Sequence, residues 1–176
     1  IRDVERSRGL GDVYKRQVLT DATIVCTTER EAQLLVTFGA RCTTAVAMLP
    51  PDPHLPARPT ARQDVRARLG LPADGRVLVF IGRIDYKKGL EPLLAALART
   101  SCPCHLVVAG RGTPRFEQML RTTAERLGIA DRTHFIGWIS GQDKADLYGA
   151  GDMFVLLSDR ENYGIAAMEA AQHGLP

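Results

Sequence analysis

The chain alternates short apolar runs with stretches whose apolar residues recur at helical spacing. The run at 76–81 (RVLVFI) is almost wholly apolar, which is typical of a strand buried on both faces of a parallel sheet. Similar runs predict further strands at 105–109, 133–136 and 153–157. Helical periodicity predicts helices at 65–69, 90–98, 115–127, 144–148 and 164–172. This order predicts an α/β fold with a Rossmann-like, doubly wound parallel sheet.

A shorter α/β segment precedes this region. The β-rich run at 22–26 and the stretch at 43–49 predict two strands. Between them, Thr28 stands three residues before Glu31, a spacing that predicts a capped helix start. We expect this helix to run to about residue 38 and to end at Gly39, where a left-handed backbone costs least.

A proline-rich stretch separates the two regions. Five prolines fall between Pro50 and Pro59, which predicts an extended linker over residues 50–61. We therefore expect two domains, at 18–49 and at 62–176. The sequence stops after a predicted helix, where a parallel sheet would continue with another strand, so we expect the sheet to be truncated at both ends.

Composition and charge narrow the class of protein. With 45% hydrophobic and 24% charged residues, the 176-residue chain is globular, and it has no apolar run of membrane-spanning length. The net charge is +3, but residues 1–17 carry five Lys/Arg and three Asp/Glu, and the remainder carries 18 and 17. The basic excess is therefore local, and we expect no nucleic-acid partner.

Residues 1–17 stand apart from the rest of the sequence. Their end, DVYKRQ at 12–17, reverse-translates to a transposon-end adapter used in DNA library preparation, so we interpret the segment as a translated adapter. A charged natural helix is the alternative. The cysteines lack the paired spacing of a zinc site or a disulfide framework, which indicates reduced thiols in a cytoplasmic protein; they are Cys26, Cys42, Cys102 and Cys104.

Candidate chemistry gathers at the predicted strand ends, where open parallel sheets bind ligands. After the strand at 76–81, Gly82 permits a sharp turn, and Arg83 and Lys88 supply two cations suited to a diphosphate. A solvated basic loop is the alternative interpretation. The sequence Gly-Arg-Gly at 110–112 is a weaker signal, because it lacks the third glycine of a dinucleotide-binding fingerprint.

The last strand end carries the sharpest pattern. Glu161 and Glu169 are separated by seven residues, Asn162 can cap the following helix, and Gly164 lets a ligand approach its first amides. A helix N-terminus is a favourable anion site. Glu169 is the lone charge on an apolar helix, so we expect that helix to be buried and the carboxylate to have a partner. A solvent-facing Glu169 is the alternative.

These residues resemble a known family. The two glutamates with the trailing Gly-Leu-Pro at 174–176, the loop at 82–89 and the Phe-Ile-Gly strand end at 135–137 are similar to the donor-binding half of retaining glycosyltransferases of family 4, which have the GT-B fold. The resemblance covers residues 18–176. It implies that 18–49 is the end of an acceptor-binding domain, 50–61 the interdomain linker, and 62–176 an incomplete donor-binding domain.

The resemblance also implies roles for individual residues. Arg83 and Lys88, beside Gly82, would hold the diphosphate and stabilise the leaving group; Glu161 would contact the transferred sugar, and Glu169 the ribose hydroxyls. The turn that meets sugar and phosphate would be Asn162, Tyr163, Gly164 and Ile165, and the base would lie against Trp138, Ile139 and Lys144. The sequence Asp52-Pro53-His54 departs from the Gly-Val-Asp often found after the prolines.

The implied activity is transfer of a hexosyl group from a nucleoside-diphosphate sugar to an acceptor, with retention of configuration. No metal or other cofactor is required. The acceptor could be a lipid, a glycan or a small molecule, and the whole enzyme could associate with the inner face of the membrane. We expect this chain alone to be inactive. The alternatives are a relative of starch or sucrose synthases with the same donor site, and a non-catalytic, Rossmann-like nucleotide-binding module.

Overall fold

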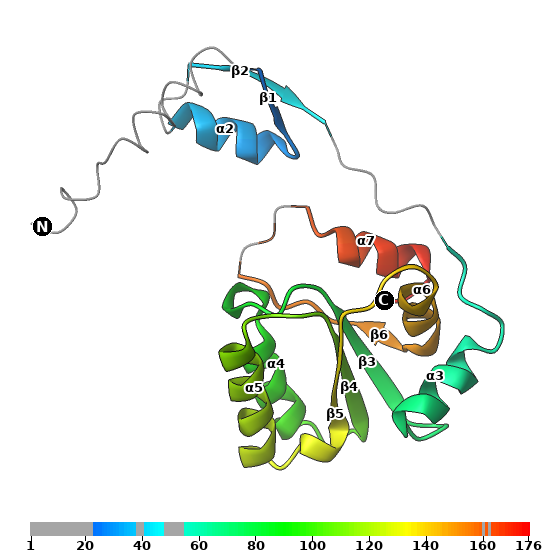
Figure 1. The fold of residues 1–176 in the computed structure, drawn as a ribbon. Coiled ribbons are helices and arrows are strands. Elements are labelled where there is room, and N and C mark those ends of the chain that lie inside the picture. Colours follow the sequence, from blue (N-terminus) through cyan, green and yellow to red (C-terminus); the bar gives the residue numbers. More distant parts are fainter. Residues whose placement is uncertain (1–22, 38–40, 48–54, 160, 162) are drawn as a thin grey trace, which may run out of the picture. The chain divides into compact units, whose positions relative to one another are not determined.

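The computed structural model describes residues 23–37, 41–47, 55–159, 161 and 163–176 (Figure 1). They form two compact units, one within residues 1–50 and one within 51–176. The predictions for residues 1–17, for Gly39 and for residues 48–54 fall outside the described residues.

Among its described residues, the smaller unit has a two-stranded sheet and a helix. Strands β1 (Thr23–Cys26) and β2 (Thr43–Val46) pair in parallel, and α2 (Glu29–Thr37) connects them. The predicted cap is confirmed, because the Glu31 amide donates to Thr28 Oγ1 at 3.2 Å. The carboxylate of Glu31 in turn accepts the amide of Thr27 at 2.7 Å.

The larger unit is an α/β layer structure with one parallel sheet, in the order β5-β4-β3-β6. Its strands are β3 (Arg76–Ile81), β4 (Cys104–Ala109), β5 (Thr133–Gly137) and β6 (Met153–Phe154). Its α-helices are α3 (Ala61–Leu69), α4 (Leu90–Arg99), α5 (Pro114–Arg126), α6 (Gly141–Ala150) and α7 (Ile165–Gln172). Two short 3₁₀ helices are η1 (Tyr86–Lys88) and η2 (Ala130–Arg132). The predicted α/β fold is confirmed.

Helices cover both faces of this sheet (Figure 1). Phe80 and Val108 pack with Leu94 of α4 and Leu120 of α5 on one face. On the other face, Val77, Val79 and Val107 pack with residues of α3, α6 and α7. Successive strand residues point to opposite faces, so burial of both faces explains the unbroken apolar runs in the sequence.

The strand order fixes where a ligand can bind. From β3 the chain moves outward through β4 to β5, and it then returns to place β6 on the other side of β3. This reversal opens a crevice at the carboxyl ends of β3 and β6, the position at which open α/β sheets bind ligands.

In the larger unit, three elements differ from the sequence predictions by more than one residue. Helix α3 begins at residue 61 instead of 65, and α6 spans 141–150 instead of 144–148. Both helices are polar in their first turn, so apolar periodicity reveals only their later residues. Strand β6 has two residues instead of five, because its ladder with β3 covers only residues 153–154, although Val155 and Leu156 still pack against the core.

Candidate functional site

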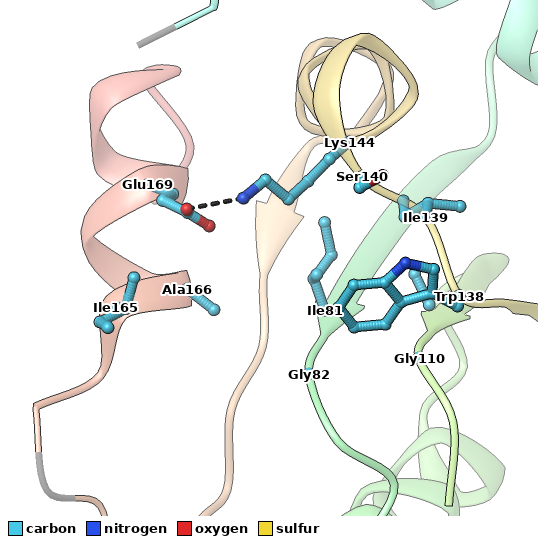
Figure 2. A pocket seen from close by; sticks show the side chains of 11 residues that line it. Ile81, Gly82, Gly110, Trp138, Ile139, Ser140, Lys144, Ile165, Ala166 and Glu169 are labelled. Atoms are coloured by element: carbon cyan, nitrogen blue, oxygen red, sulfur yellow. Dashed lines mark hydrogen bonds and ion pairs between the residues drawn. The ribbon is translucent and has the colours of Figure 1, made fainter. Parts of the chain in front are cut away.

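A pocket of about 370 Å³ opens at the carboxyl edge of the sheet, between α6 and α7 (Figure 2). Six of the residues predicted from the sequence line it: Gly82, Trp138, Ile139, Lys144, Ile165 and Glu169. Ile81, Ala109, Ser140 and Ala166 also line it, and so does Gly110 of the Gly-Arg-Gly sequence.

Two glycines form the floor of this pocket, at the ends of β3 and β4. A Cβ atom on Gly110 would lie 1.8 Å from the carbonyl oxygen of Gly82, and the φ of Gly110 is +146°, which disfavours any side chain there. The amide of Gly110 donates to the carbonyl of Gly137 at 2.7 Å. A Cβ atom on Gly112 would likewise lie 2.1 Å from the carbonyl oxygen of Ile84. Close backbone approach therefore requires glycine at 110 and 112, a reason independent of the dinucleotide fingerprint that these residues fail to match.

Glu169 lies at the edge of the pocket, with its side chain only 8% exposed. Lys144 Nζ on α6 reaches across to Glu169 Oε1 at 2.7 Å (Figure 2). The hydroxyl of Tyr148 donates to Glu169 Oε2 at 3.1 Å. The expectation that this carboxylate has a partner is confirmed, and the solvent-facing alternative is wrong.

Helix α7 is less buried than its composition predicts. Only Glu169 and Ala170 are buried, whereas Ile165 and Met168 are each 36% exposed. The expectation that the whole helix is buried is wrong, because α7 packs through one face only. Its N-cap is Gly164, with a φ of +68°. Asn162, which we expected to cap this helix, lies outside the described residues.

A second polar cluster joins the ends of β3 and β6. Lys88 Nζ lies 2.6 Å from Glu161 Oε2, and Ser158 Oγ donates to the same oxygen at 3.1 Å. Partial burial of Glu161 opposes its ionisation, but the hydrogen bonds from Lys88, Ser158 and the amide of Gly164 outweigh burial and lower its pKa. This carboxylate is therefore held ionised at the start of α7.

Close backbone packing brings these two residues together. Gly89, with a φ of +69°, lies so near the β6 exit that a Cβ atom there would be 2.0 Å from the carbonyl oxygen of Leu157. The amide of Asp159 donates to the carbonyl of Lys87 at 3.1 Å. The two loops are thus fixed against each other, and a glycine is needed at position 89 for both space and conformation.

Not every predicted residue joins the two clusters. The side chain of Arg83 is 73% exposed, and its Nε lies 3.8 Å from Asp85 Oδ2. Trp138 lines the pocket but is 71% exposed, which places its indole at the pocket mouth. Tyr163 is half-buried and does not line the pocket. The structure therefore brings together the lysines and glutamates, and leaves Arg83 at the surface.

Two further features bear on the class of site. Within the described ranges, no group of three or more His, Cys, Asp or Glu side chains is arranged to hold a metal ion. None of the helices in the part of the chain that the structure describes combines the length and apolar character of a membrane span.

Comparison with known proteins identifies the class. The fold of this chain is shared with solved glycosyltransferases of the GT-B type. Residues 61–176 match the family described as glycosyl transferases group 1, and the chain belongs to this family.

Its relatives include longer transferases. A D-inositol 3-phosphate glycosyltransferase of Xylanimonas cellulosilytica is 31% identical over 99% of this chain and 44% of the relative. One from Saccharomonospora viridis is 36% identical over 97% and 42%. A mannosylfructose-phosphate synthase of Agrobacterium fabrum is 28% identical over 87% and 36%. The chain thus spans less than half the length of these relatives.

Two solved structures show the same fold. Anabaena HepE, crystallised with UDP and glucose, superposes with a TM-score of 0.79 at 23% identity, over 88% of this chain and 43% of that one. Sucrose-phosphate synthase of Thermosynechococcus elongatus has a TM-score of 0.79 at 24% identity, over 100% of this chain and 45% of that one.

Proposed function

We propose that this chain is the donor-binding part of a retaining family 4 glycosyltransferase, which transfers a hexosyl group from a nucleoside-diphosphate sugar. One observation carries the proposal. Two lysine–glutamate pairs, Lys88–Glu161 and Lys144–Glu169, stand at the start of α7 and along it, at the carboxyl edge of a parallel sheet. The five residue steps from Gly164 to Glu169 correspond to about 7.5 Å along the helix axis, which leaves room for a diphosphate between the carboxylates.

Each end of such a ligand has a candidate contact. Glu169 accepts the ribose hydroxyls at the pocket edge, and Glu161 accepts hydroxyls of the transferred sugar. The base lies against Trp138 and Ile139 at the far side of the pocket, because the ammonium of Lys144, expected beside the base, is paired with Glu169. The backbone amides of Tyr163 and Ile165, beside Gly82 on the pocket floor, are the proposed donors to sugar and phosphate.

The chemistry of the proposed step is electrostatic. Departure of the nucleoside diphosphate builds negative charge on the β-phosphate oxygens. The ammonium of Lys88 and the positive N-terminus of α7 are placed to offset that charge, and the exposed guanidinium of Arg83 can turn toward it. In a retaining transfer, the acceptor attacks from the face that the diphosphate leaves. In the proposed mechanism these cations, and not a metal ion, supply the stabilisation.

The names of the relatives favour one class of acceptor. D-inositol 3-phosphate glycosyltransferase and mannosylfructose-phosphate synthase both name small phosphorylated molecules. We therefore propose a phosphorylated polyol or sugar as the acceptor, ahead of a lipid or a glycan. With such an acceptor, the protein would act in the cytoplasm without needing the inner face of the membrane.

Binding and turnover test the proposal separately. Titration of the chain with UDP, GDP and ADP, and with glucose and mannose esters of each, should give saturable binding for at least one nucleotide. Sugar transfer by this chain alone is not expected, because transfer requires donor and acceptor to be held together. If the folded chain binds none of these ligands, it does not contain a nucleotide-sugar site. Turnover by the pure chain would refute the proposal that this chain supplies only the donor-binding part of the enzyme.

A further inference from the structure

A buried tyrosine hydroxyl lies behind the pocket carboxylate. Tyr148 is 1% exposed, and its hydroxyl is 3.1 Å from both Glu169 Oε2 and the carbonyl oxygen of Ala166. Its ring stacks on His173, with centroids 5.1 Å apart, and packs against Phe154 at 6.2 Å. Two aromatic contacts therefore hold the ring, so its hydroxyl is held at one place.

Lys144 holds the other oxygen of the same carboxylate. It lies one helical turn before Tyr148, so both side chains project from the same face of α6. Its Nζ is 2.7 Å from Glu169 Oε1, and its side chain is 19% exposed. Because the two groups engage different oxygens, the carboxyl plane cannot rotate without losing one of these bonds.

The pair between Lys144 and Glu169 also changes the net charge of the pocket that a ligand enters. Glu169 lines the pocket, and a buried carboxylate without a cation would repel the phosphates of an incoming ligand. The ammonium of Lys144 offsets that charge at the point of entry. The pocket can then accept an anion and still offer carboxylate lone pairs to hydroxyl groups.

We propose that Tyr148 and Lys144 are positioning residues for Glu169, and that Lys144 also lets a diphosphate enter beside that carboxylate. The inference rests on the proposed donor-binding function. A purely structural bridge between α6 and α7 is the competing explanation. It predicts that removal of either group lowers stability and leaves the affinity of the folded protein for ligands unchanged.

Nucleosides and nucleoside diphosphates distinguish the two explanations. The 176-residue chain and its variants would be titrated with UDP, GDP and ADP and with uridine, guanosine and adenosine. In Tyr148→Phe, both kinds of ligand should bind about tenfold more weakly, because Glu169 loses its fixed orientation and its hydrogen bonds to the ribose hydroxyls weaken. In Lys144→Met, the diphosphate should lose more affinity than the nucleoside, and Lys144→Arg should recover most of the difference.

Thr133→Val provides the matched control. Thr133 is a buried hydroxyl on β5 that donates to the carbonyl of Ile129 at 2.9 Å and does not line the pocket. This variant should lower the melting temperature without changing any affinity. If Tyr148→Phe fails to fold, the comparison of Lys144→Met with Lys144→Arg carries the test.

The outcomes separate this inference from the proposed function. If the folded wild-type chain binds none of the six probes, the proposed function fails and this inference fails with it. If the wild-type chain binds and Glu169→Gln binds more weakly, while Tyr148→Phe and Lys144→Met bind like wild type, the positioning role is refuted and the donor site stands. Equal losses of nucleoside and diphosphate in Lys144→Met would refute the charge-compensating role.

Discussion

Lys88 Nζ lies 2.6 Å from Glu161 Oε2, although 73 positions separate the two residues in the sequence. The pair joins the loop after β3 to the loop after β6, the two strands on either side of the switch point in the sheet. It therefore places a cation and a carboxylate where the fold directs a ligand.

Glu161→Gln tests the role of this carboxylate in the whole enzyme. Because Glu161 precedes α7 and does not line the pocket, it should contact the transferred sugar and leave the nucleotide untouched. We expect kcat to fall by about tenfold to a hundredfold, as a charged hydrogen bond is lost, with little change in the affinity for the nucleoside diphosphate. Steady-state kinetics and calorimetry measure the two quantities. Weaker diphosphate binding with unchanged kcat would contradict the assignment.

Gly89→Ala should separate the two loops. The new Cβ would meet the carbonyl of Leu157 at 2.0 Å, so the backbone must shift, and the Lys88–Glu161 pair should open. Gly70→Ala is the matched control, because Gly70 has a similar φ of +63° and nothing within 4 Å of the added atom. The control should cost about 1 kcal/mol of stability from backbone conformation alone. If Gly89→Ala and Gly70→Ala lower the melting temperature equally, the packing between the loops at Gly89 and Leu157 does not stabilise the fold.

The stacked histidines His105 and His134 predict loss of stability in mild acid. His105 Nδ1 and His134 Nε2 are 3.2 Å apart, and burial is the largest cause of the lowered pKa of each ring. Asp131 acts in the opposite direction on both, and Arg132 reinforces the lowering at His105. Because the pKa of each ring is lower in the folded state, the unfolded chain takes up protons at a higher pH than the folded chain does.

The two neutral histidines should therefore make their full contribution to the free energy of unfolding above the ordinary histidine pKa of about 6.5. That contribution should decline as the pH falls below this value. Denaturant unfolding at pH 7.5 and 5.5 measures the effect. The difference between the two conditions should shrink in the variant His105→Gln with His134→Gln. An unchanged difference would assign the pH dependence to other groups.

Arg66 predicts a large stability effect far from the pocket. Its side chain is 4% exposed, pairs with Asp152 at 2.8 Å, and donates to three carbonyl oxygens of the loop at 72–75. Arg66→Met leaves those acceptors without this donor, while Asp152 keeps its pair with Arg62, so the free energy of unfolding should fall by about 1–3 kcal/mol.

Arg68→Met is the control on the same helix. Arg68 is 56% exposed and lies 3.8 Å from Asp143, so its loss should cost at most about 1 kcal/mol. Urea unfolding of the two variants compares them directly. A similar midpoint for both would mean that the Arg66 network does not stabilise the fold.

The sequence predicts the strands well, because burial on both faces leaves a continuous apolar run. It predicts the start of α3 poorly, since that helix is held by polar contacts distant in sequence. Arg62 and Arg66 of α3 both pair with Asp152, 90 and 86 positions away. Such pairs have no periodic signature, so the predicted helix begins only at its first large apolar residue, Val65.

The candidate site shows the same limit. Because Glu169 is the only charged residue on an apolar helix, the sequence predicts that its carboxylate has a bonding partner. The sequence does not indicate which residue that partner is. Lys144 was expected beside the base, yet its ammonium bonds to Glu169. Tyr148 was missed, although its spacing of four residues from Lys144 places both on one face of α6. The packing of α6 against α7 selects these partners, and that packing is a tertiary property.

Calorimetric titration of Glu169→Gln beside the wild-type chain tests the central claim most directly, that the pocket holds the nucleotide part of a sugar donor. UDP, GDP and ADP serve as ligands, and far-UV circular dichroism confirms that both proteins are folded. We predict saturable binding of at least one nucleotide to the wild type, and about tenfold to a hundredfold weaker binding to the variant. Equal affinity of the two folded proteins for every nucleotide would contradict the account.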